Sequence, residues 1–534
     1  MFIIKRDGDV EPFDKQKIVN AINKAFLEVD GKIYEHDTAN DIAEEIYNLA
    51  AQTEDGSLEV EEIQDLVEEF LMRSERKDVA RSYIRYRYKK EVARGYTNDF
   101  INAIKEKLNA DDVQNQNANV DEHSFGGRIG EASGVVTKKL ALDHLLSPVA
   151  RRNHLNNEVY IHDLDSYYVG SHNCLSIPFD DLLAKGFNTR QTDVRPAGSV
   201  NTAFQLVAVI FQLQSLQQFG GVSATHIDWT MVPYVRKSFW KHYKDGLKYV
   251  EGLKDSSIKR YLVTMFKKGF NPKQVPIDDE SFYTYYDAYN YAIDMTIKET
   301  HQAVEGLYHN LNTLQSRSGN QLPFTSINYG TCTLPEGRLV TRELLNVSIE
   351  GLGKLHKTSI FPCGIFQYMK GVNDKPGTPN YDLYQLALKS TAKRLYPNYA
   401  NVDWSGNAGY DREDPKTYFS TMGCRTANGA DINAEPGVNP QTKDGRGNIC
   451  PVTIIMPTLA MEAKELDGDI IENFFNLLDT KIHEAKDMLL ERFEWICSQS
   501  PASAKFMYEN NTMIGYHPEE GIRSALKHGT LVVG

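Results

Sequence analysis

Apolar residues recur at helical spacing in three places near the start of the chain. After Asp14, a good N-cap residue, they occupy positions 18, 21, 22, 25 and 26. A second stripe covers positions 63, 66, 67, 70 and 71, and a third helix, rich in Arg and Tyr, is expected over about 79–94. The Phe-Ile-Ile of positions 2–4 predicts a short strand, and Asp7-Gly8 a hairpin turn. We therefore predict a small helical domain with a β cap over residues 1–95.

The pattern changes after this region. Residues 111–124, DDVQNQNANVDEHS, are polar, and we expect a linker over 96–124. From about 125 to 534, helical segments alternate with short apolar or β-branched segments such as VYIHDLD, PFTSINYGT and PVTIIMPTLAM. Alternating strands and helices predict an α/β architecture with a buried sheet.

A long polar stretch interrupts this alternation. Residues 421–426, TMGCRT, are followed by ANGADINAEPGVNPQTKDGRGN and then by the strongly apolar ICPVTIIMP. Loops of this length without secondary structure are uncommon in compact domains and are usually functional or disordered. Cys424 stands at the head of this loop, which makes it a candidate for chemistry.

Composition and charge narrow the function classes. The chain has 41% hydrophobic and 25% charged residues, as in ordinary globular proteins, and a formal net charge of −13. That charge argues against generic nucleic-acid binding, which depends on clustered Lys and Arg. No apolar run has the length of a membrane span or a signal peptide, so we expect a cytoplasmic protein without a membrane partner.

The six cysteines (Cys174, Cys332, Cys363, Cys424, Cys450 and Cys497) include no C-x-x-C pair, so they indicate neither a disulfide framework nor a zinc site. Cys332, Cys363 and Cys497 have apolar or aromatic neighbours and are expected in the core. Cys174 lies at the start of an apolar strand. Cys424 has no His or Asp placed locally to make it a conventional nucleophile, and a thiol carried on a loop into a barrel suits hydrogen-atom transfer.

Lys5, Arg6 and Lys17 lie where the predicted hairpin meets the first helix. Helix starts and turn backbones bind phosphate, and added cations favour a triphosphate. A solvated cluster of basic residues remains the alternative at this point. The segments FIIKRDG, PFDKQKIVNAINKAF, EVEEIQDLVEEFLM and ARSYIRYR resemble the ATP-cone, a regulatory nucleotide-binding module. The resemblance implies that Lys5, Arg6 and Lys17 contact ATP or dATP as allosteric effectors.

The rest of the chain resembles a second family. YIHDLD with the downstream Cys174, NVDEHSFGGRIGEA, PFTSINYGT, MGCRT, GRGN and HPEEGIRSALKHGTL are similar to the anaerobic (class III) ribonucleoside-triphosphate reductases. The resemblance implies a ten-stranded α/β barrel with a finger loop in its centre. Cys424 matches the fingertip cysteine that becomes a thiyl radical and abstracts the 3′ hydrogen of the ribose. Cys174 matches the cysteine on the other face of the sugar, which donates hydrogen as the 2′ hydroxyl leaves.

Asn448 lies 448 − 424 = 24 residues after Cys424 and matches the active-site asparagine of family members that use formate as reductant. An amide can both donate to and accept from a hydroxyl or a small carboxylate. Without the resemblance, an asparagine in a G-x-G-N turn would be interpreted as structural. Cys450, two residues later, is expected on the same side of a strand as Asn448 and is interpreted as a core residue.

The resemblance also implies partners. They are ribonucleoside triphosphates as substrates, a radical-SAM activating enzyme with a 4Fe-4S cluster and S-adenosylmethionine, and a second copy of the chain in a homodimer. No nucleic acid is expected as a partner. The family stores its radical on a glycine in a C-terminal R-V-x-G-Y loop that follows a four-cysteine zinc site, and neither motif occurs here. We therefore expect residues 125–534 to be a C-terminally incomplete barrel that needs a separate glycyl-radical fragment, which would also hold the zinc.

Two other interpretations remain at this point. A glycyl-radical lyase of the pyruvate formate-lyase type shares the barrel, but such enzymes use adjacent cysteines, and no Cys-Cys pair occurs here. The second is an inactive or regulatory nucleotide-binding fragment, which the ATP-cone segments and the missing glycine motif favour. Cys174, Cys424 and Asn448 argue against it.

Overall fold

The computed structural model describes residues 1–5, 8–32, 37–53, 56–108, 124–315, 321–422 and 426–534. Its contacts divide the chain into two compact units, Met1–Glu106 and Lys107–Gly534. Each unit is described by itself below. Within the described residues, no helix combines the length and the apolar character that crossing a membrane requires.

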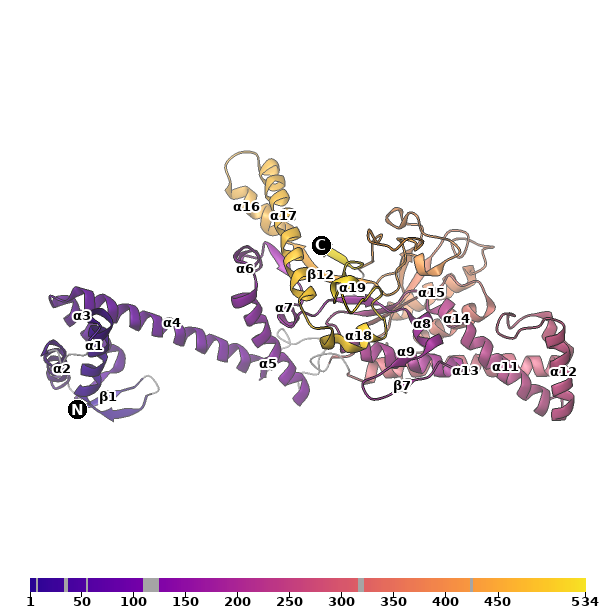
Figure 1. Cartoon of the computed structure of the whole chain (residues 1–534), viewed down its shortest axis with the longest axis horizontal. Helices are drawn as coiled ribbons and strands as arrows, with labels where there is room; N and C mark the ends of the chain where they lie inside the picture. The colour runs from indigo at the N-terminus through magenta and orange to yellow at the C-terminus, as the bar shows by residue number, and fades with distance from the viewer. Residues whose placement is uncertain (6–7, 33–36, 54–55, 109–123, 316–320, 423–425) are drawn as a thin grey trace. The chain divides into compact units, whose positions relative to one another are not determined.

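The N-terminal unit combines a small sheet with helices. Its strands β1 (Phe2–Ile4), β2 (Val10–Pro12) and β3 (Ser57–Glu59) form a sheet in the order β2-β1-β3. β1 is antiparallel to β2 and parallel to β3. The helices are α1 (Lys15–Asp30), α2 (Asp37–Ala50), α3 (Val60–Arg73) and α4 (Lys77–Leu108), as Figure 1 shows.

The predicted stripes supply the core of this unit. Ile22 and Phe26 of α1 are buried in one cluster with Val67 and Leu71 of α3. Asp14 is the N-cap of α1, because its carboxylate accepts a hydrogen bond from the Gln16 N–H at 2.9 Å. The third predicted helix is longer than expected: α4 continues to Leu108, so residues 96–108 of the expected linker are helical. Residues 109–123 lie outside the described part.

The second unit is built around one large sheet. Its strands are β4 (Val159–Ile161), β5 (Cys174–Ser176), β8 (Val222–Ala224), β9 (Thr325–Tyr329), β10 (Cys363–Tyr368), β11 (Asn398–Asn401), β12 (Gly447–Ile454) and β13 (Thr530–Val533). The order is β11-β10-β9-β8-β5-β12-β13, and β4 also pairs with β12. The described residues thus contain eight strands of this sheet, where the family resemblance led us to expect ten. A separate small hairpin joins β6 (Phe187–Asn188) to β7 (Asp193–Val194).

Strand direction divides the sheet into two parts. From β11 through β10, β9 and β8 to β5, every neighbouring pair is parallel. β12 runs antiparallel to β5 and β4 but parallel to β13. Parallel strands need crossover connections, which explains the helices between β8 and β11. β13, the apolar strand near the end of the chain, forms one edge of the sheet.

The larger helices of this unit are α5 (Phe125–Leu140), α6 (Pro148–Leu155), α8 (Phe179–Lys185), α9 (Val200–Ser215), α11 (Val232–Tyr249), α12 (Asp255–Lys267), α13 (Tyr286–Thr313), α14 (Pro335–Glu350), α15 (Tyr381–Arg394), α16 (Met456–Glu465) and α17 (Ile470–Cys497). Shorter helices are α7 (Leu164–Tyr167), α10 (Ile227–Thr230), α18 (Lys505–Glu509) and α19 (Arg523–Leu526). A π-helical turn at Ala141–Leu145 follows α5, and 3₁₀ turns include Glu280–Tyr285, Ser405–Asn407, Pro415–Thr417 and Pro501–Ala504.

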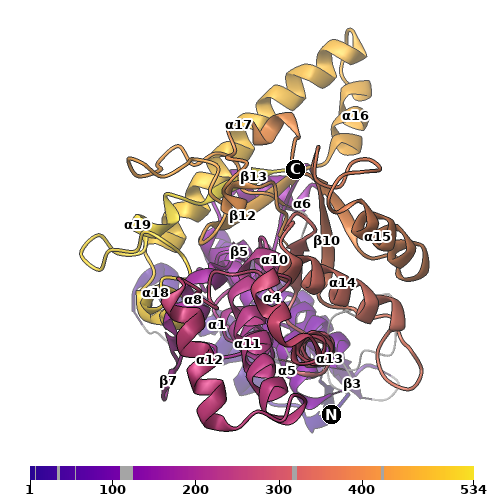
Figure 2. The same ribbon diagram turned by 90° about the vertical axis from the view of Figure 1, so that its right-hand side faces the viewer.

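Two apolar clusters hold these elements together. The first joins the parallel strands to α9, α11, α13 and α14, with Phe211, Phe239 and Phe366 among its buried side chains. The second joins β4 and β12 to α17 through residues such as Val452 and Leu489. α16 and α17 form a helical hairpin that extends away from the sheet in both views (Figures 1 and 2).

Candidate active site

Cys174 begins β5, as the sequence predicted, and its thiol is held in a polar setting. The residue is 1% exposed. Its Sγ donates to Asn173 Oδ1 at 2.8 Å and accepts from the Gly221 N–H at 3.3 Å. The amide of Asn173 in turn donates to the carboxylate of Asp163. The thiol is therefore oriented by two neighbours and linked through Asn173 to the YIHDLD segment.

Asn448 lies directly opposite Cys174. The two residues are partners in the antiparallel pairing of β12 with β5, and the Asn173 N–H donates to the Asn448 carbonyl at 3.1 Å. Asn448 is 1% exposed, and its Oδ1 has no hydrogen-bond partner among the described residues. A buried amide oxygen without a partner is costly unless a ligand or water supplies a donor. The pairing brings together two of the three catalytic residues expected from the sequence.

The loop that carries Cys424 lies between the 3₁₀ turn Pro415–Thr417 and β12. Cys424 itself falls outside the described residues, as does Arg6. Of its described neighbours on the loop, Met422 is 1% exposed and Ser420 is 4% exposed, whereas Thr421 and Thr426 are half-buried. The Met422 N–H donates to the Thr426 carbonyl at 2.8 Å. After the tip, the Gly445 N–H donates to the Ser176 carbonyl at 2.7 Å, so the returning part of the loop is bonded to β5.

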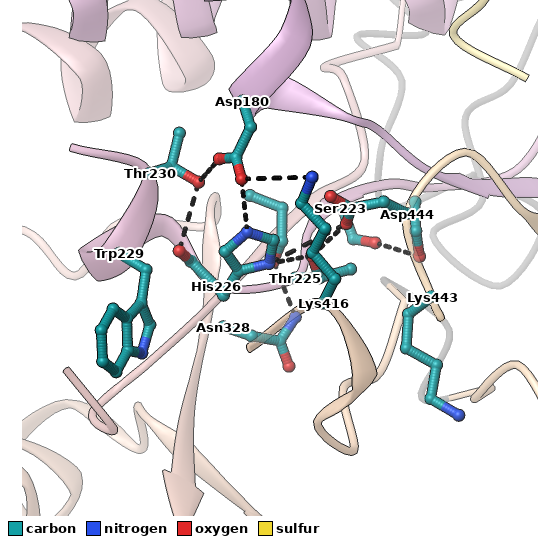
Figure 3. Close-up of polar contacts among 12 residues, drawn as sticks. Asp180, Ser223, Thr225, His226, Trp229, Thr230, Asn328, Lys416, Lys443 and Asp444 are labelled. Carbon is teal, nitrogen blue, oxygen red and sulfur yellow. Dashed lines mark hydrogen bonds and ion pairs between the residues drawn. The ribbon is translucent and has the colours of Figure 1, made fainter. Parts of the chain in front are cut away.

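A charged network lies at the two ends of this loop (Figure 3). His226 Nε2 is 3.2 Å from Asp180 Oδ2, and Lys416 Nζ is 3.8 Å from the same oxygen. On its other side, His226 Nδ1 is 2.6 Å from Thr225 Oγ1 and 3.9 Å from Asp444 Oδ1. Lys416 precedes the loop and Asp444 lies near its end, so the network ties both ends to α8 and α10.

Electrostatics fix the protonation of this network. Burial alone would lower the pKa of His226, but Asp180 and Asp444 together raise it to about 9. Burial would raise the pKa of Asp180, and the interaction with His226 lowers it below the ordinary value. Burial raises the pKa of Asp444 to about 6, against the opposing effect of His226. At neutral pH we therefore assign an imidazolium between carboxylates.

Asp180, His226 and Asp444 also form a group whose ligand atoms lie within 4.8 Å of one another, close enough to hold a metal ion. Both ring nitrogens of His226 already have protein partners, Thr225 Oγ1 and Asp180 Oδ2, and the ammonium of Lys416 faces Asp180. The two cations balance the two carboxylates. We therefore interpret the group as a charged network that anchors the loop.

A cavity of about 660 Å³ lies beside the hydrogen-bonded series that starts at Cys174. Asp163, which binds Asn173, is among its lining residues, with Lys138 of α5 and Gln321. The cavity is large enough for a small ligand. Its lining does not include Cys174 or Asn448, so it adjoins the pair only through Asp163.

Three of the other described cysteines, Cys363, Cys450 and Cys497, belong to or pack against the apolar clusters. Cys332 and Cys363 are buried in the core as predicted, whereas Cys497 is half-buried. Cys450 is fully buried, and burial raises the pKa of its thiol to about 12. Its Sγ points to the Leu489 carbonyl of α17 at 3.5 Å, and the pairing of β12 with β13 is irregular between Asn448 and Cys450. The expectation that Asn448 and Cys450 lie on the same side of the strand assumed regular alternation. The irregularity interrupts that alternation.

At the N-terminal unit, Lys5 and Lys17 converge on one carboxylate. Lys17 Nζ lies 3.1 Å from Glu11 Oε2, and Lys5 Nζ contacts Glu11 Oε1. All three line a cavity of about 230 Å³ that also involves Asp14 and Tyr83. Two cations at one cavity, beside the N-terminus of α1, form an arrangement that suits an anionic ligand.

Sequence reasoning missed the network of Asp180, His226, Lys416 and Asp444. Its members come from four separate segments, and each residue taken singly is more easily explained as a core or surface residue. The only signal was the position of Lys416 and Asp444 at the two ends of the long loop. Such a signal identifies the residues only after the fold has brought α8 and α10 to the same place.

Comparison with known proteins gives concordant results for both units. The family model "Anaerobic ribonucleoside-triphosphate reductase" matches residues 116–534, and the model "ATP cone domain" matches residues 1–92. The chain is 29% identical over 533 residues to the anaerobic ribonucleoside-triphosphate reductase of Haemophilus influenzae, covering 99% of this chain and 68% of the relative. It is 30% identical over 534 residues to that of Escherichia coli, covering 99% and 67%. The chain thus spans about two thirds of the length of these relatives.

The fold is also similar to that of a solved reductase. The anaerobic ribonucleotide reductase from Thermotoga maritima with citrate in the active site superimposes with a TM-score of 0.51 at 15% identity, covering 84% of this chain and 71% of that one. This likeness supports the fold alone. Together with the family matches, it confirms the predicted fold class, an ATP-cone followed by an α/β sheet of the reductase type. The matches favour the reductase interpretation over a lyase or a purely regulatory fragment, and the chain belongs to the anaerobic ribonucleoside-triphosphate reductase family.

Proposed function

We propose that this chain reduces ribonucleoside triphosphates by thiyl-radical chemistry, with Cys424, Cys174 and Asn448 as its catalytic residues. The observation that carries the proposal is the pairing of Cys174 with Asn448 across β5 and β12, at the place where the long loop returns to the sheet. Both side chains are buried. A dry site protects a radical from side reactions with solvent.

In the proposed reaction, the sulfur radical of Cys424 takes the 3′ hydrogen atom of the ribose. An S–H bond forms, and the unpaired electron stays on C3′. The 2′ hydroxyl then leaves as water with the proton of the 3′ hydroxyl, and Cys174 donates a hydrogen atom to the resulting C2′ radical and becomes a sulfur radical. The reductant returns a hydrogen atom to Cys174 and gives one electron, together with a proton, to the 3′ ketone, after which Cys424 returns its hydrogen atom to C3′ and is a radical again. Because the Cys174 thiol already donates to Asn173 and accepts from the Gly221 N–H, its direction is fixed before substrate binds.

We propose formate as the reductant. The overall balance is ribonucleotide, formate and one proton giving deoxyribonucleotide, carbon dioxide and water. The residues present fit this reagent, since the amide of Asn448 can donate to a carboxylate, while its Oδ1, which has no partner in the described part of the chain, can accept from a ribose hydroxyl. Because Asn448 lies opposite Cys174, it would hold both formate and the ribose next to the Cys174 sulfur.

The N-terminal residues 1–95 are proposed as the regulatory domain, with residues 125–534 as the catalytic domain. Lys5 and Lys17, together with Arg6, are proposed to bind the phosphates of ATP or dATP. In the bound state a triphosphate would replace Glu11 as the partner of both lysines. The charge-assisted contacts would then order the hairpin against α1.

The radical itself requires partners. We propose that a radical-SAM activating enzyme generates it on a glycyl-radical segment of the family's C-terminal type, which would also contain the zinc site. A homodimer is the proposed assembly.

The proposal is tested by product formation in the activated system, with the C-terminal part supplied. Cys424→Ser and Cys174→Ser should each abolish deoxyribonucleotide formation, because a hydroxyl is a far poorer hydrogen-atom donor than a thiol. Cys332→Ser is the matched control, since Cys332 is fully buried and lies in the core. It should retain activity if it folds. Equal loss in all three variants would show that the substitutions affect stability and not chemistry.

A further inference from the structure

One buried amide on the inner side of the sheet binds the backbone of the long loop. Asn328 of β9 is fully buried. Its Nδ2 donates to the Ala224 carbonyl of β8 at 2.9 Å and to the Thr421 carbonyl at 3.0 Å. The Thr421 N–H donates back to Asn328 Oδ1 at 3.1 Å. Asn328 therefore satisfies both backbone polar groups of a residue three positions before Cys424.

The neighbouring strand has a similar arrangement that uses donors only, since Gln367 Oε1 has no hydrogen-bond partner among the described residues. Gln367 of β10 is also fully buried. Its Nε2 donates to the Thr225 carbonyl at 3.2 Å and to the Phe419 carbonyl at 3.0 Å. Phe419 and Thr421 are two residues apart, the spacing at which an extended chain presents the same side. The side-chain amides of Asn328 and Gln367, on adjacent strands, thus bind two alternate residues of the same stretch of loop.

These bonds continue the anchoring that the charged network begins. Lys416, which faces Asp180, fixes the start of the loop, and Asn328 lies close to the Thr225–His226 segment of that network (Figure 3). The loop is thus held at residues 416, 419 and 421. Because the amides contact main-chain atoms, they fix the path of the loop and not the identity of its side chains.

We propose that Asn328 and Gln367 are positioning residues that set the location of the Cys424 thiol. The inference rests on the proposed role of Cys424 in the reaction. Hydrogen-atom transfer requires reacting atoms about 3–3.5 Å apart, and a misplacement of about 1 Å can lower a rate about 100-fold. A loop without secondary structure of its own needs outside partners to meet that requirement. Asn328 and Gln367 supply them next to the tip.

The chain contains a closely matched control. Asn380 is fully buried, and its Nδ2 also donates to two carbonyls, Gly330 at 3.1 Å and Cys332 at 2.9 Å. Its Oδ1 accepts from Arg338 Nη1 at 2.7 Å. Asn380 therefore has the burial and bonding of Asn328, but none of these three partners is a loop residue, Asn328 or Gln367.

The test measures cysteine labelling on the full chain. A short anaerobic pulse of N-ethylmaleimide, followed by digestion and mass spectrometry, gives a rate for each cysteine. Asn328→Leu and Gln367→Met remove the hydrogen bonds while keeping similar side-chain size. Both variants should change the labelling rate of Cys424 by about tenfold or more, with Cys332 and Cys450 within about twofold of wild type. Asn380→Leu should leave the Cys424 rate within about twofold.

Three outcomes would overturn the proposal. They are an unchanged Cys424 rate in Asn328→Leu, an equal change in Asn380→Leu, and a joint rise of Cys424, Cys332 and Cys450 in both loop-contact variants. The last would mean that the amides hold the sheet and not the loop. If Asn328→Leu raises the labelling rates of all three cysteines and Gln367→Met does not, the Cys424 rate in Gln367→Met decides whether the proposal holds. Labelling reports the position of Cys424 and not its role in the reaction. Its result is therefore independent of the activity measured for Cys424→Ser.

Discussion

The thiols of this chain differ in the groups that surround them. Burial raises the pKa of Cys332 above the ordinary range, and Cys450 has a carbonyl as its hydrogen-bond partner. Both are therefore inert thiols within the core. Cys174 is equally buried but has both an acceptor, Asn173 Oδ1, and a donor, the Gly221 N–H. That pair of contacts orients the S–H bond, which a core cysteine does not require.

His226 gives the protein a pH-dependent term in stability. Its pKa is about 9 in the folded chain, above the ordinary value of 6.5. The folded state therefore binds more protons between these values, and the stabilisation from His226 decreases as pH rises from about 6.5 to 9. Lys443 has the opposite effect above pH 7, because burial and Arg446 lower its pKa to about 7. A variant that removes only His226 separates its contribution from that of Lys443.

We predict that the difference in unfolding free energy between wild type and His226→Gln decreases between pH 6.5 and 9. The slope should approach about 1.4 kcal/mol per pH unit at most. Denaturant unfolding at several pH values measures it, and the contribution of Lys443 cancels in the difference. A difference that stays constant over this range would mean that His226 is neutral in the folded protein.

At the residue level, the sequence allowed Cys174, Cys424 and Asn448 to be proposed because each lies in a short motif with a recognisable neighbourhood. The pairing of Cys174 with Asn448 could not be predicted, since it depends on β12 running antiparallel to β5. Asp180 and His226 lie in segments that had no motif. Their role follows only from the side-chain distances in the folded chain.

At the level of elements, the junction of β5 and β12 depends on a glycine. A Cβ on Gly447 would lie 2.1 Å from the Cys174 carbonyl, which is a backbone atom that cannot move independently. We predict that Gly447→Ala destabilises the fold by about 1–3 kcal/mol, as overpacking usually does. Thermal or denaturant unfolding would measure the change.

Gly306 provides the comparison. It lies in α13, and a Cβ there would meet nothing within 4 Å. Gly306→Ala should stabilise the protein by about 0.5–1 kcal/mol, because alanine is favoured over glycine inside a helix. If Gly447→Ala were as stable as Gly306→Ala, β5 and β12 could not be as close as described.

Periodicity predicted some elements and missed others. The stripes of α1 and α3 were found because their apolar residues repeat at helical spacing, and that of α1 also follows a clear N-cap, Asp14. α2 has a similar repeat, with Ile42 and Ile46 buried, but it was not identified. The polar residues 96–108 were expected to form a linker, whereas the helical Arg- and Tyr-rich segment before them continues through them as α4. Composition alone does not end a helix.

At the level of the whole molecule, a net charge of −13 coexists with local cationic sites. The cavity at Lys5, Lys17 and Glu11 belongs to the region that matches the ATP-cone. We predict that the full chain binds ATP and dATP competitively with micromolar affinity, about −8 kcal/mol. Lys17→Met should weaken both by about tenfold, the value of one charge-assisted contact. Titration calorimetry measures the affinity.

Lys24→Met is the matched control for this prediction. Lys24 is an exposed lysine of the same helix, and it is not among the residues that line the cavity. Its replacement should leave both affinities unchanged. An absence of heat with either nucleotide, or an equal loss in both variants, would contradict the assignment of this cavity as the effector site.

The most direct measurement of the central claim follows the 3′ hydrogen of the substrate. In the activated system, a ribonucleoside triphosphate carrying deuterium at C3′ is incubated with the wild type, Cys424→Ser or Cys174→Ser, and isotope loss is measured by mass spectrometry. We predict no 3′ exchange in Cys424→Ser. Cys174→Ser should retain exchange without forming product, since Cys174 acts only after the hydrogen is removed. Exchange that persists in Cys424→Ser would contradict the account.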